Sequence, residues 1–592
     1  MNLPKKEEVV SFAVLTVAVV SLALIPTLQT LAKTGAEWRG VPPAYVSDSL
    51  FYYAQVQQVA EGHLFAGNPY FIEHRNAVSP AFFVPEWLYA IPLFFGLSLT
   101  TTITLNFVLW SLLFAFLAFG IFRTLRLPQS ASVAGSIFVY LQAYWLILRP
   151  VSMQQVFPFF LLFFLALVLW LREPTKPRNT VFLTLATVAP FYIYAYLWQV
   201  VVVVNMLTAV YLLLSKKKVA DIYRFVFINI AALLLAIPEL VLLFRQFSTP
   251  FYWDTMYRIG LVKTHIPPLY SIYYVRWMGV VVLIGTLLYL FLRGKNKQEA
   301  QRIGELNIAS FLLGAGLFVV MISNIITGKE LETATHIGRF VMVWFAFCFV
   351  AYGFVVIKER VALQELALTR KVALAFLFLL CTLGLIRVFP ESLPFASISR
   401  DTSVIGLQGY AAPLAWLNKK ESAPVVIWAD SLLSHYVPIM TKHYVLFAAA
   451  GGLQVESSQE VEERYLVSEY FNNLSVQDLE RNYRVYAGAG NAKDKPEAYD
   501  RMTKVCKFFQ LYRLGFSCGT EVSGIALKGQ EYFLHLESEY KAIQANIGAE
   551  LKKFNVAYII KDKENDPQFH PEDIKGATLV YDDGRFLIYK IK

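Results

Sequence analysis

Long apolar runs constrain the fold of this chain more than any other feature. Runs of about 20 mostly apolar residues are the signature of helices that cross a bilayer. We expect eleven spans, near 9–26, 101–122, 130–148, 155–171, 180–194, 198–215, 224–244, 277–292, 306–324, 340–357 and 372–389. Segments 180–194 and 198–215 could instead form a single span that is kinked at Pro190. The sequence therefore predicts a polytopic α-helical membrane protein.

The composition agrees with this class. Of the 592 residues, 56% are hydrophobic and 16% are charged, whereas a soluble chain of this length carries about 25% charged residues. The mean hydropathy is +0.48. The net charge of +10 does not indicate nucleic-acid binding, because lysines and arginines in the connections that set membrane topology account for it.

The distribution of basic residues predicts the orientation in the membrane. Short connections rich in Lys and Arg, such as residues 216–218, alternate with longer connections that contain fewer basic residues. Basic connections tend to stay in the cytoplasm, so we expect a cytoplasmic N-terminus in the cytoplasmic membrane. Eleven spans then place the loops 27–100 and 245–276 and the C-terminal region outside. The first span lacks an Ala-x-Ala cleavage site and is expected to be an anchor.

The last 200 residues change in character and predict an α/β domain. We divide the chain into a membrane bundle, 1–390, and an extracytoplasmic domain, 391–592. Strands are expected at 424–430 and 555–561, a hairpin with an Asp-Gly turn at 579–589, and amphipathic helices at 460–472 and 539–553. Cys506 and Cys518 fall in this domain. An oxidising compartment would allow a disulfide between them, and two free thiols are the alternative.

The loop 27–100 carries most of the ionisable residues in the first part of the chain. Residues 48–60 are expected to form a short helix with Asp48, Tyr52, Gln55 and Val59 on one face. Residues 81–97 contain Glu86 among apolar and aromatic residues, a pattern typical of a helix at the membrane surface. No P-loop or dinucleotide fingerprint is present in the sequence, which argues against an ATP-driven pump.

This arrangement resembles the GT-C superfamily of membrane glycosyltransferases. The shared features are a cytoplasmic N-terminus, one span, and then an early aspartate before a short helix that ends in glycine. The matching residues are Asp48-x3-Tyr52-x-Ala54 to Glu61-Gly62, then Asn68-Pro69-Tyr70 and Glu73-His74. The superfamily includes dolichyl-phosphate-mannose protein mannosyltransferases and bacterial lipid-A aminoarabinose transferases. Many relatives carry Asp-Glu or Asp-Asp where this chain has Asp48 and Ser49.

The resemblance implies transfer of a sugar from a polyprenyl-phosphate carrier to a glycan, lipid or protein acceptor on the outer face. The acceptor loses a proton as it attacks the anomeric carbon, so a carboxylate base must lie within hydrogen-bond reach. Asp48 is the candidate base. The alternative is that Asp48 only caps the helix that follows it, a position at which aspartate is favoured. Membrane lipid is an expected partner, and nucleic acid is not.

The leaving group is a lipid phosphate, which requires positive charge at the outer interface. His336 and Arg339 are favoured because Thr335-His336-Ile337-Gly338-Arg339 opens a span. The other basic candidates are Arg149, Arg245, Arg258, Lys263, His265 and Arg276. Cations of this kind can also be interfacial anchors that reach toward headgroups.

Further substrate ligands are expected from the loop 27–100. Tyr52, Glu73 and His74 complete the predicted substrate-binding set with His336, Arg339, Arg258 and Lys263. No organic cofactor is expected, and a divalent metal shared by Glu73 and Asp48 is one option, because hard cations prefer carboxylates. For Glu73 and Glu86, each taken alone, we expect a solvated loop carboxylate.

Two other classes of protein compete with the enzyme. A lipid-linked transporter or flippase would place charges near the middle of the bilayer, where Glu239, beside Pro238, is the main example. A membrane scaffold would use its outer domain only to bind a partner.

Overall fold

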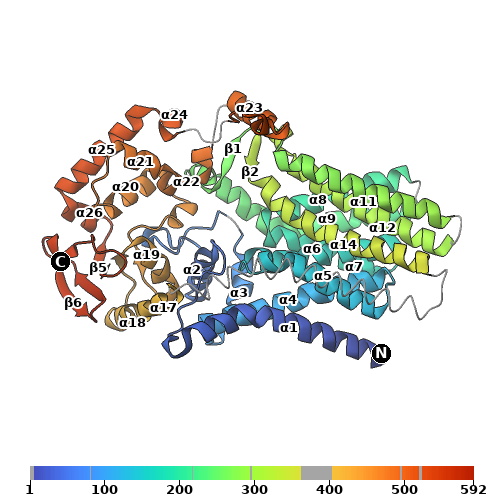
Figure 1. Cartoon of the computed structure of the whole chain (residues 1–592), viewed down its shortest axis with the longest axis horizontal. Helices are drawn as coiled ribbons and strands as arrows, with labels where there is room; N and C mark the ends of the chain where they lie inside the picture. The colour runs from blue at the N-terminus through green and yellow to red at the C-terminus, as the bar shows by residue number, and fades with distance from the viewer. Residues whose placement is uncertain are drawn as a thin grey trace.

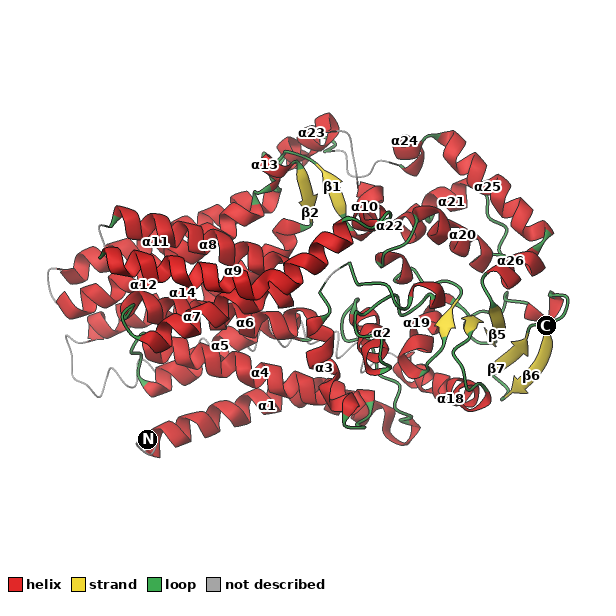
Figure 2. Ribbon diagram, turned by 180° about the vertical axis from the view of Figure 1, so that it is seen from behind, coloured by secondary structure: helices red, strands yellow, loops and turns green. Residues whose placement is uncertain are grey.

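The computed structural model describes residues 6–80, 82–215, 218–293, 297–361, 403–493, 497–518 and 523–592. A bundle of long helices and a smaller C-terminal domain lie end to end (Figure 1). Each long helix of the bundle runs between the end that contacts this domain, here called the domain-side end, and the opposite end, here called the far end (Figures 1 and 2).

Ten helices occupy the positions at which spans are predicted. They are α1 (Lys6–Thr34), α4 (Leu99–Thr124), α5 (Gln129–Ile147), α6 (Ser152–Arg172), α7 (Pro177–Ile193), α8 (Ala195–Leu214), α9 (Val219–Phe247), α11 (Leu269–Arg293), α12 (Lys297–Met321) and α14 (Thr333–Val361). Within the described ranges, eight helices are long and apolar enough to cross a membrane; α7 and α11 are not among those eight. The polytopic membrane fold is thus confirmed. The expected span at 372–389 and the expected domain boundary at 390 lie outside the described residues.

Residues 180–215 form two helices rather than one kinked helix. The backbone of Tyr194 is extended, with φ −164° and ψ 127°, and separates α7 from α8. Asn205 Nδ2 lies 3.5 Å from Thr187 Oγ1, so α8 folds back along α7. This reversal places Tyr194 at the domain-side end of the bundle.

Three connections rich in Lys and Arg begin at the far end. The turns that follow α4, α6 and α8 begin near Arg123, Arg172 and Leu214, and each of these helices starts at the domain-side end (Figure 1). The starts of these basic connections and the C-terminal domain are therefore at opposite ends of the bundle, as the charge pattern of the sequence predicts.

The loop 27–100 contains the helices that were expected in it. Helix α2 spans Ser49–Ala60, the short 3₁₀ turn η2 spans Ile72–His74, and α3 spans Val84–Phe94. Helix α3 has only 11 residues, too few to cross a bilayer. Glu86 in its first turn is buried, and its Oε2 atom has no hydrogen-bond partner among the described residues. The expectation of a solvated carboxylate is wrong for Glu86, because α3 packs that face inward.

The C-terminal domain has a mixed five-stranded sheet in the order β4-β3-β5-β7-β6. Its strands are β3 (Val426–Trp428), β4 (Tyr444–Val445), β5 (Val556–Asp562), β6 (Thr578–Asp582) and β7 (Phe586–Lys590). Strand β3 is parallel to β4 and β5, whereas β7 is antiparallel to β5 and β6. The domain also contains the helices α17 (Ser403–Leu407), α18 (Ala411–Lys420), α19 (Ser431–Met440), α20 (Ser458–Ser468), α21 (Val476–Arg481), α22 (Tyr483–Lys493), α23 (Glu497–Phe508), α24 (Gly524–Lys528), α25 (Gln530–Ala545) and α26 (Ile547–Lys553). The predicted strands and hairpin are confirmed.

The loop 27–100 and the C-terminal domain share one hydrophobic core. Tyr53 and Phe71 of the loop are fully buried in the same cluster as Leu433 and Tyr558 of the domain. The backbone N–H of Val445, in the edge strand β4, donates to the carbonyl of Tyr70 at 2.8 Å. The loop thus completes the core of the domain, and α2 lies between the bundle and the sheet (Figure 2).

A disulfide joins Cys506 to Cys518 in the domain, with their Cα atoms 5.3 Å apart. Of the two alternatives that the sequence left open, the structure has the disulfide. Bonds of this kind persist in oxidising compartments.

Two glycines let α22 approach the short helix α10 (Tyr252–Ile259) closely. Gly488 has φ +80°, a conformation that residues with a side chain rarely adopt. A β-carbon at Gly490 would overlap the carbonyl oxygens of Tyr257 and Leu261. Helix α10 follows span α9, so this contact fastens the domain to the bundle.

We expect the substitution Gly490→Ala to destabilise the protein by about 1–3 kcal/mol, because an added methyl group would separate α22 from α10. The matched control is Gly548→Ala, in helix α26, where a β-carbon would meet no atom within 4 Å. Alanine favours helix there, so the control should be neutral or slightly stabilising. Thermal unfolding of the detergent-solubilised chain measures both, and equal melting temperatures would contradict the close approach.

Burial of Glu86 predicts a pH-dependent loss of stability. Burial raises the pKa of Glu86 from 4.5 to about 8. Between these values the unfolded chain releases the proton and the folded chain retains it, so the folded state loses stability as the pH rises. Glu86→Gln removes this penalty. The free energy of unfolding of the variant, measured with denaturant, should exceed that of the wild type increasingly from pH 5 to pH 8, by about 1 kcal/mol or more at pH 8. Glu531→Gln, at an exposed position, should show no such trend.

Candidate functional site

Asp48 does not cap the helix that it precedes. Its side chain makes no capping hydrogen bond to α2. Instead, Oδ2 forms an ion pair with Nη2 of Arg149, and Oδ1 accepts a hydrogen bond of 3.1 Å from Ser47 Oγ. The capping alternative is therefore wrong. The carboxylate is 40% exposed, so it remains accessible while it is paired.

Arg149 connects Asp48 to Tyr52, one turn later on α2. Its Nη2 atom also donates to the Tyr52 hydroxyl at 3.2 Å, and its guanidinium carbon lies 5.5 Å from the centre of the Tyr52 ring. The Nε–H of Arg149 is buried and has no acceptor among the described residues. A buried cationic donor without an acceptor is costly, and an anionic ligand can satisfy it.

The backbone beside Arg149 is strained. Val151 has φ +60° and ψ −61°, and the N–H of Ser152 donates to the carbonyl of Pro150 at 2.5 Å, which closes a tight three-residue turn. Positive φ is a costly conformation for a β-branched residue. Strain of this kind gathers at functional sites, and here it lies two residues after Arg149.

A second group at the domain-side end consists of Tyr194, Tyr196, His336 and Arg339. The Tyr194 hydroxyl and Arg339 Nη1 both meet Nδ1 of His336, the latter at 3.4 Å. Because arginine can only donate, Nδ1 must accept, and the proton of the ring is on Nε2. The ring of Tyr196 stacks on His336 with centroids 4.2 Å apart.

The two groups are neighbours. Burial raises the pKa of the Tyr194 hydroxyl, and the nearby charges of Arg339 and Arg149 lower it part of the way. Tyr194 thus lies between the guanidinium groups that come from the α5–α6 connection and from α14. Asp48, Tyr52, His336 and Arg339 of the predicted set come together here.

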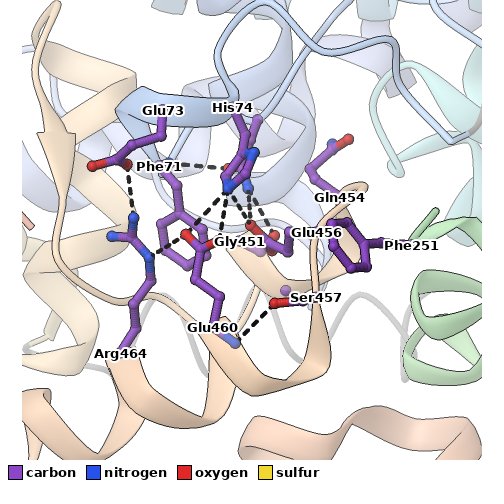
Figure 3. A network of polar contacts seen from close by, with 12 residues as sticks. Phe71, Glu73, His74, Phe251, Gly451, Gln454, Glu456, Ser457, Glu460 and Arg464 are labelled. Atoms are coloured by element: carbon purple, nitrogen blue, oxygen red, sulfur yellow. Dashed lines mark hydrogen bonds and ion pairs between the residues drawn. The ribbon is translucent and has the colours of Figure 1, made fainter. Parts of the chain in front are cut away.

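Glu73 and His74 belong to a different network, at the junction of the loop with the domain (Figure 3). Arg464, on α20, is buried between the rings of Phe71 and Phe554 and pairs with Glu73 at 2.7 Å. Asp48 and Glu73 therefore have separate partners, and a metal shared by the two stays a prediction.

His74 contacts two glutamates of the domain in the same network. Its Nε2 atom is 2.9 Å from Glu460 and 3.9 Å from Glu456. Burial alone would raise the pKa of Glu460, but the hydrogen bond with His74 and the charge of Arg464 lower it to about 2. Burial raises the pKa of Glu456 well above its ordinary value.

Arg258 and Lys263 lie beside the domain as well. Arg258, on α10, is 1% exposed, and its guanidinium donates to the carbonyls of Gly452, Gln454 and Glu456 at 2.7 to 3.2 Å. It therefore fastens a domain loop to the bundle. Lys263, in strand β1 (Leu261–Lys263), has its Nζ 5.2 Å from the centre of the Tyr257 ring. Their predicted contacts with substrate remain predictions.

Two residues of the site stand out less in the sequence than in the structure. Arg149 is one of several basic candidates there, and Tyr194 is one member of an aromatic turn that an interfacial belt also explains. Their position in the sequence could have indicated them, because both lie between two successive spans at the end of the bundle where Asp48 is found. Among the remaining candidates, Arg245 is exposed, His265 Nδ1 is 3.1 Å from the carbonyl of Ile325, and the side chain of Arg276 lies outside the described residues.

A cavity of about 390 Å³ lies elsewhere in the bundle. It is lined mostly by apolar residues of α8, α11 and α12, among them Leu207, Leu214 and Val281. Leu207 is eleven residues beyond Tyr196 on the same helix, which corresponds to about 16 Å toward the far end. This cavity does not adjoin Asp48.

No protein-family model matches the chain, and no curated protein matches it by sequence. Among solved structures, it is similar to ArnT from Cupriavidus metallidurans in the apo state, at 11% identity, over 97% of both chains and with a TM-score of 0.39. ArnT bound to undecaprenyl phosphate gives 10% identity, the same coverage and the same score. The archaeal oligosaccharyltransferase AglB from Archaeoglobus fulgidus, in complex with an inhibitory peptide and a dolichol-phosphate, gives 11% identity, 96% of this chain, 74% of that chain and a TM-score of 0.42. Both are GT-C membrane glycosyltransferases. Since these TM-scores lie below 0.5, the functional proposal rests on the side chains of this chain.

Proposed function

We propose that this chain is a membrane glycosyltransferase that moves a sugar from a polyprenyl-phosphate carrier to an acceptor outside the cytoplasmic membrane. The observation that carries the proposal is the ion pair of Asp48 with Arg149, whose Nε donor is buried without an acceptor among the described residues. A general base and an anion-binding guanidinium are thus adjacent at one end of a membrane bundle.

In the proposed reaction, Asp48 takes the proton of an acceptor hydroxyl or amine. The acceptor atom forms a bond to the anomeric carbon, and the bond from that carbon to the phosphate oxygen breaks. The electron pair of the broken bond stays on the lipid phosphate, whose growing negative charge Arg149 and Arg339 stabilise. Tyr52, Tyr194 and His336 hold these groups in place.

The ion pair between Asp48 and Arg149 is compatible with this reaction. Before substrate binds, the ion pair with Arg149 holds the Asp48 carboxylate at the site. The donor phosphate is a diester with one negative charge and two terminal oxygens, which arginine can bind through two parallel hydrogen bonds. When the donor phosphate occupies the guanidinium, Asp48 is released toward the acceptor.

Two observations support an outer location of the site. The Lys- and Arg-rich connections after α4, α6 and α8 begin at the far end of the bundle, which the positive-inside tendency assigns to the cytoplasm. The disulfide between Cys506 and Cys518 lies in the domain at the other end and suits an oxidising compartment.

Asp48→Asn should lower kcat/KM for transfer from a radiolabelled polyprenyl-phosphate sugar by about 100-fold or more, because the amide cannot accept the proton. The control is Asp221→Asn, which removes a carboxylate paired with Arg224 at 2.7 Å at the far end of the bundle. Its activity should stay within about twofold of the wild type. Equal transfer by the Asp48 variant would exclude Asp48 as the base. Flux of substrate across sealed vesicles without glycoside formation would favour a transporter.

Arg149→Gln should lower kcat/KM by on the order of 100-fold, since the lost guanidinium would stabilise the leaving phosphate. Arg172→Gln is the matched control, because Arg172 pairs with Glu305 at 3.3 Å at the far end. Steady-state kinetics with varied donor measure the effect. A variant of Arg149 with unchanged kinetics would contradict its role as the phosphate ligand.

A further inference from the structure

Three side chains from two parts of the chain converge beneath the loop 27–100. His74 ends the turn η2 of the loop, Glu456 precedes α20 of the domain, and Glu460 lies in its first turn (Figure 3). One nitrogen or oxygen atom from each lies within 4.8 Å of the other two. Within the described residues, no other group of three or more such side chains comes this close together.

The spacing of these atoms fits a metal ion. Tetrahedral Zn²⁺ has bonds of about 2.0–2.1 Å, so its ligand atoms lie roughly 3.3 Å apart. The Nε2 atom of His74 is 2.9 Å from Glu460 Oε2 and 3.9 Å from Glu456 Oε2, which brackets that value. Both separations are thus within about 0.6 Å of the spacing of zinc ligands, and the two glutamate oxygens lie within 4.8 Å of each other.

Glu456 supplies a second, independent observation. Its side chain is fully buried, and its Oε1 atom has no hydrogen-bond partner among the described residues. Its carboxylate points toward His74 and Glu460 (Figure 3). A buried carboxylate oxygen without a partner is costly, and a bound cation would remove that cost.

Hydrogen bonds from other side chains orient the carboxylates of Glu456 and Glu460. Asn68 Nδ2 donates to Oε2 of Glu456 at 3.2 Å, and Arg464 Nε donates to Oε1 of Glu460 at 2.9 Å. Partners of this kind orient metal ligands in established sites. Arg464 thus holds Oε1 of Glu460 while its Oε2 faces His74. In Glu456, Oε2 lies between Asn68 and His74, and Oε1 has no partner among the described residues.

The cluster is partly open to solvent. His74 is 26% exposed and Glu460 25% exposed, so solvent reaches one side of the cluster and water can complete the coordination.

We propose that His74, Glu456 and Glu460 bind one divalent transition-metal ion, with Zn²⁺ as the reference ion, that fastens the loop 27–100 to the C-terminal domain. An imidazole ligand suits Zn²⁺, whereas Mg²⁺ and Ca²⁺ prefer sites made of oxygen. The site is separate from Asp48 and does not depend on glycosyl transfer. The ion acts on the position of the loop that carries Asp48.

Metal binding by the full-length, tag-free chain in detergent tests the proposal. After treatment with a chelator, titration with ZnCl₂ should give one bound ion per chain and raise the melting temperature. Glu456→Gln and His74→Gln, which nearly preserve side-chain volume, should each weaken Zn²⁺ binding at least tenfold. Co²⁺ should give the visible absorption of a site with a nitrogen ligand in the wild type and lose it in His74→Gln.

Two matched variants serve as controls for the Zn²⁺ titration. Glu463→Gln, on the same helix, removes a carboxylate that pairs with Lys553 and should bind Zn²⁺ as the wild type does. His535→Ala tests an exposed His–Glu pair on α25 that could bind Zn²⁺ adventitiously, and it should also leave binding unchanged.

Several outcomes would overturn the site. They are absence of Zn²⁺ binding by the wild type, unchanged binding by the His74 and Glu456 variants, or loss of binding in His535→Ala. In the first case, the hydrogen bond between His74 and Glu460 joins the loop to the domain without an ion. Melting temperatures measured in chelator identify any variant that fails to fold. In that case the Co²⁺ spectrum of the wild type decides whether the site exists, because a spectrum without a nitrogen ligand would contradict it.

Discussion

The hydrophobic core that the loop 27–100 shares with the C-terminal domain is the constraint on which the rest of the structure depends. Tyr53 and Phe71 are buried among domain residues, and the backbone of Tyr70 continues the hydrogen bonding at the edge of the sheet. Because the loop completes the core, its helix α2 is fixed by the domain on one side and by the bundle on the other. Asp48 therefore occupies a defined position rather than moving with a flexible loop.

The candidate site depends on where the ends of the spans meet. Asp48 precedes α2, Arg149 lies between α5 and α6, Tyr194 separates α7 from α8, and His336 opens α14. These four residues come from four different parts of the chain and lie far apart in the sequence. The strained turn at Val151 and the buried Nε of Arg149 show that the protein holds this guanidinium in a costly arrangement. Such an arrangement is useful where an anion is to be bound.

The residues predicted from the sequence separate into two networks with different partners. The apolar runs, the hairpin at 579–589 and the helix at 48–60 were predictable because they depend on local composition and periodicity. The association of Tyr52 with Asp48 was predictable for the same reason, since residues four apart share a helix face. That Glu73 and His74 face α20 was not predictable, because Arg464 and Glu460 lie almost 400 positions later.

The sequence by itself determined the class of the protein, because long apolar segments can be satisfied only as helices in a bilayer. It also determined the α/β character of the last part and the presence of an acidic residue directly before α2. The tertiary structure alone decided that Asp48 pairs with Arg149 rather than capping its helix, and that His74 meets two glutamates of the domain. The reason is that the free energy of a charge depends on the partners that folding places around it, and these partners come from distant parts of the chain.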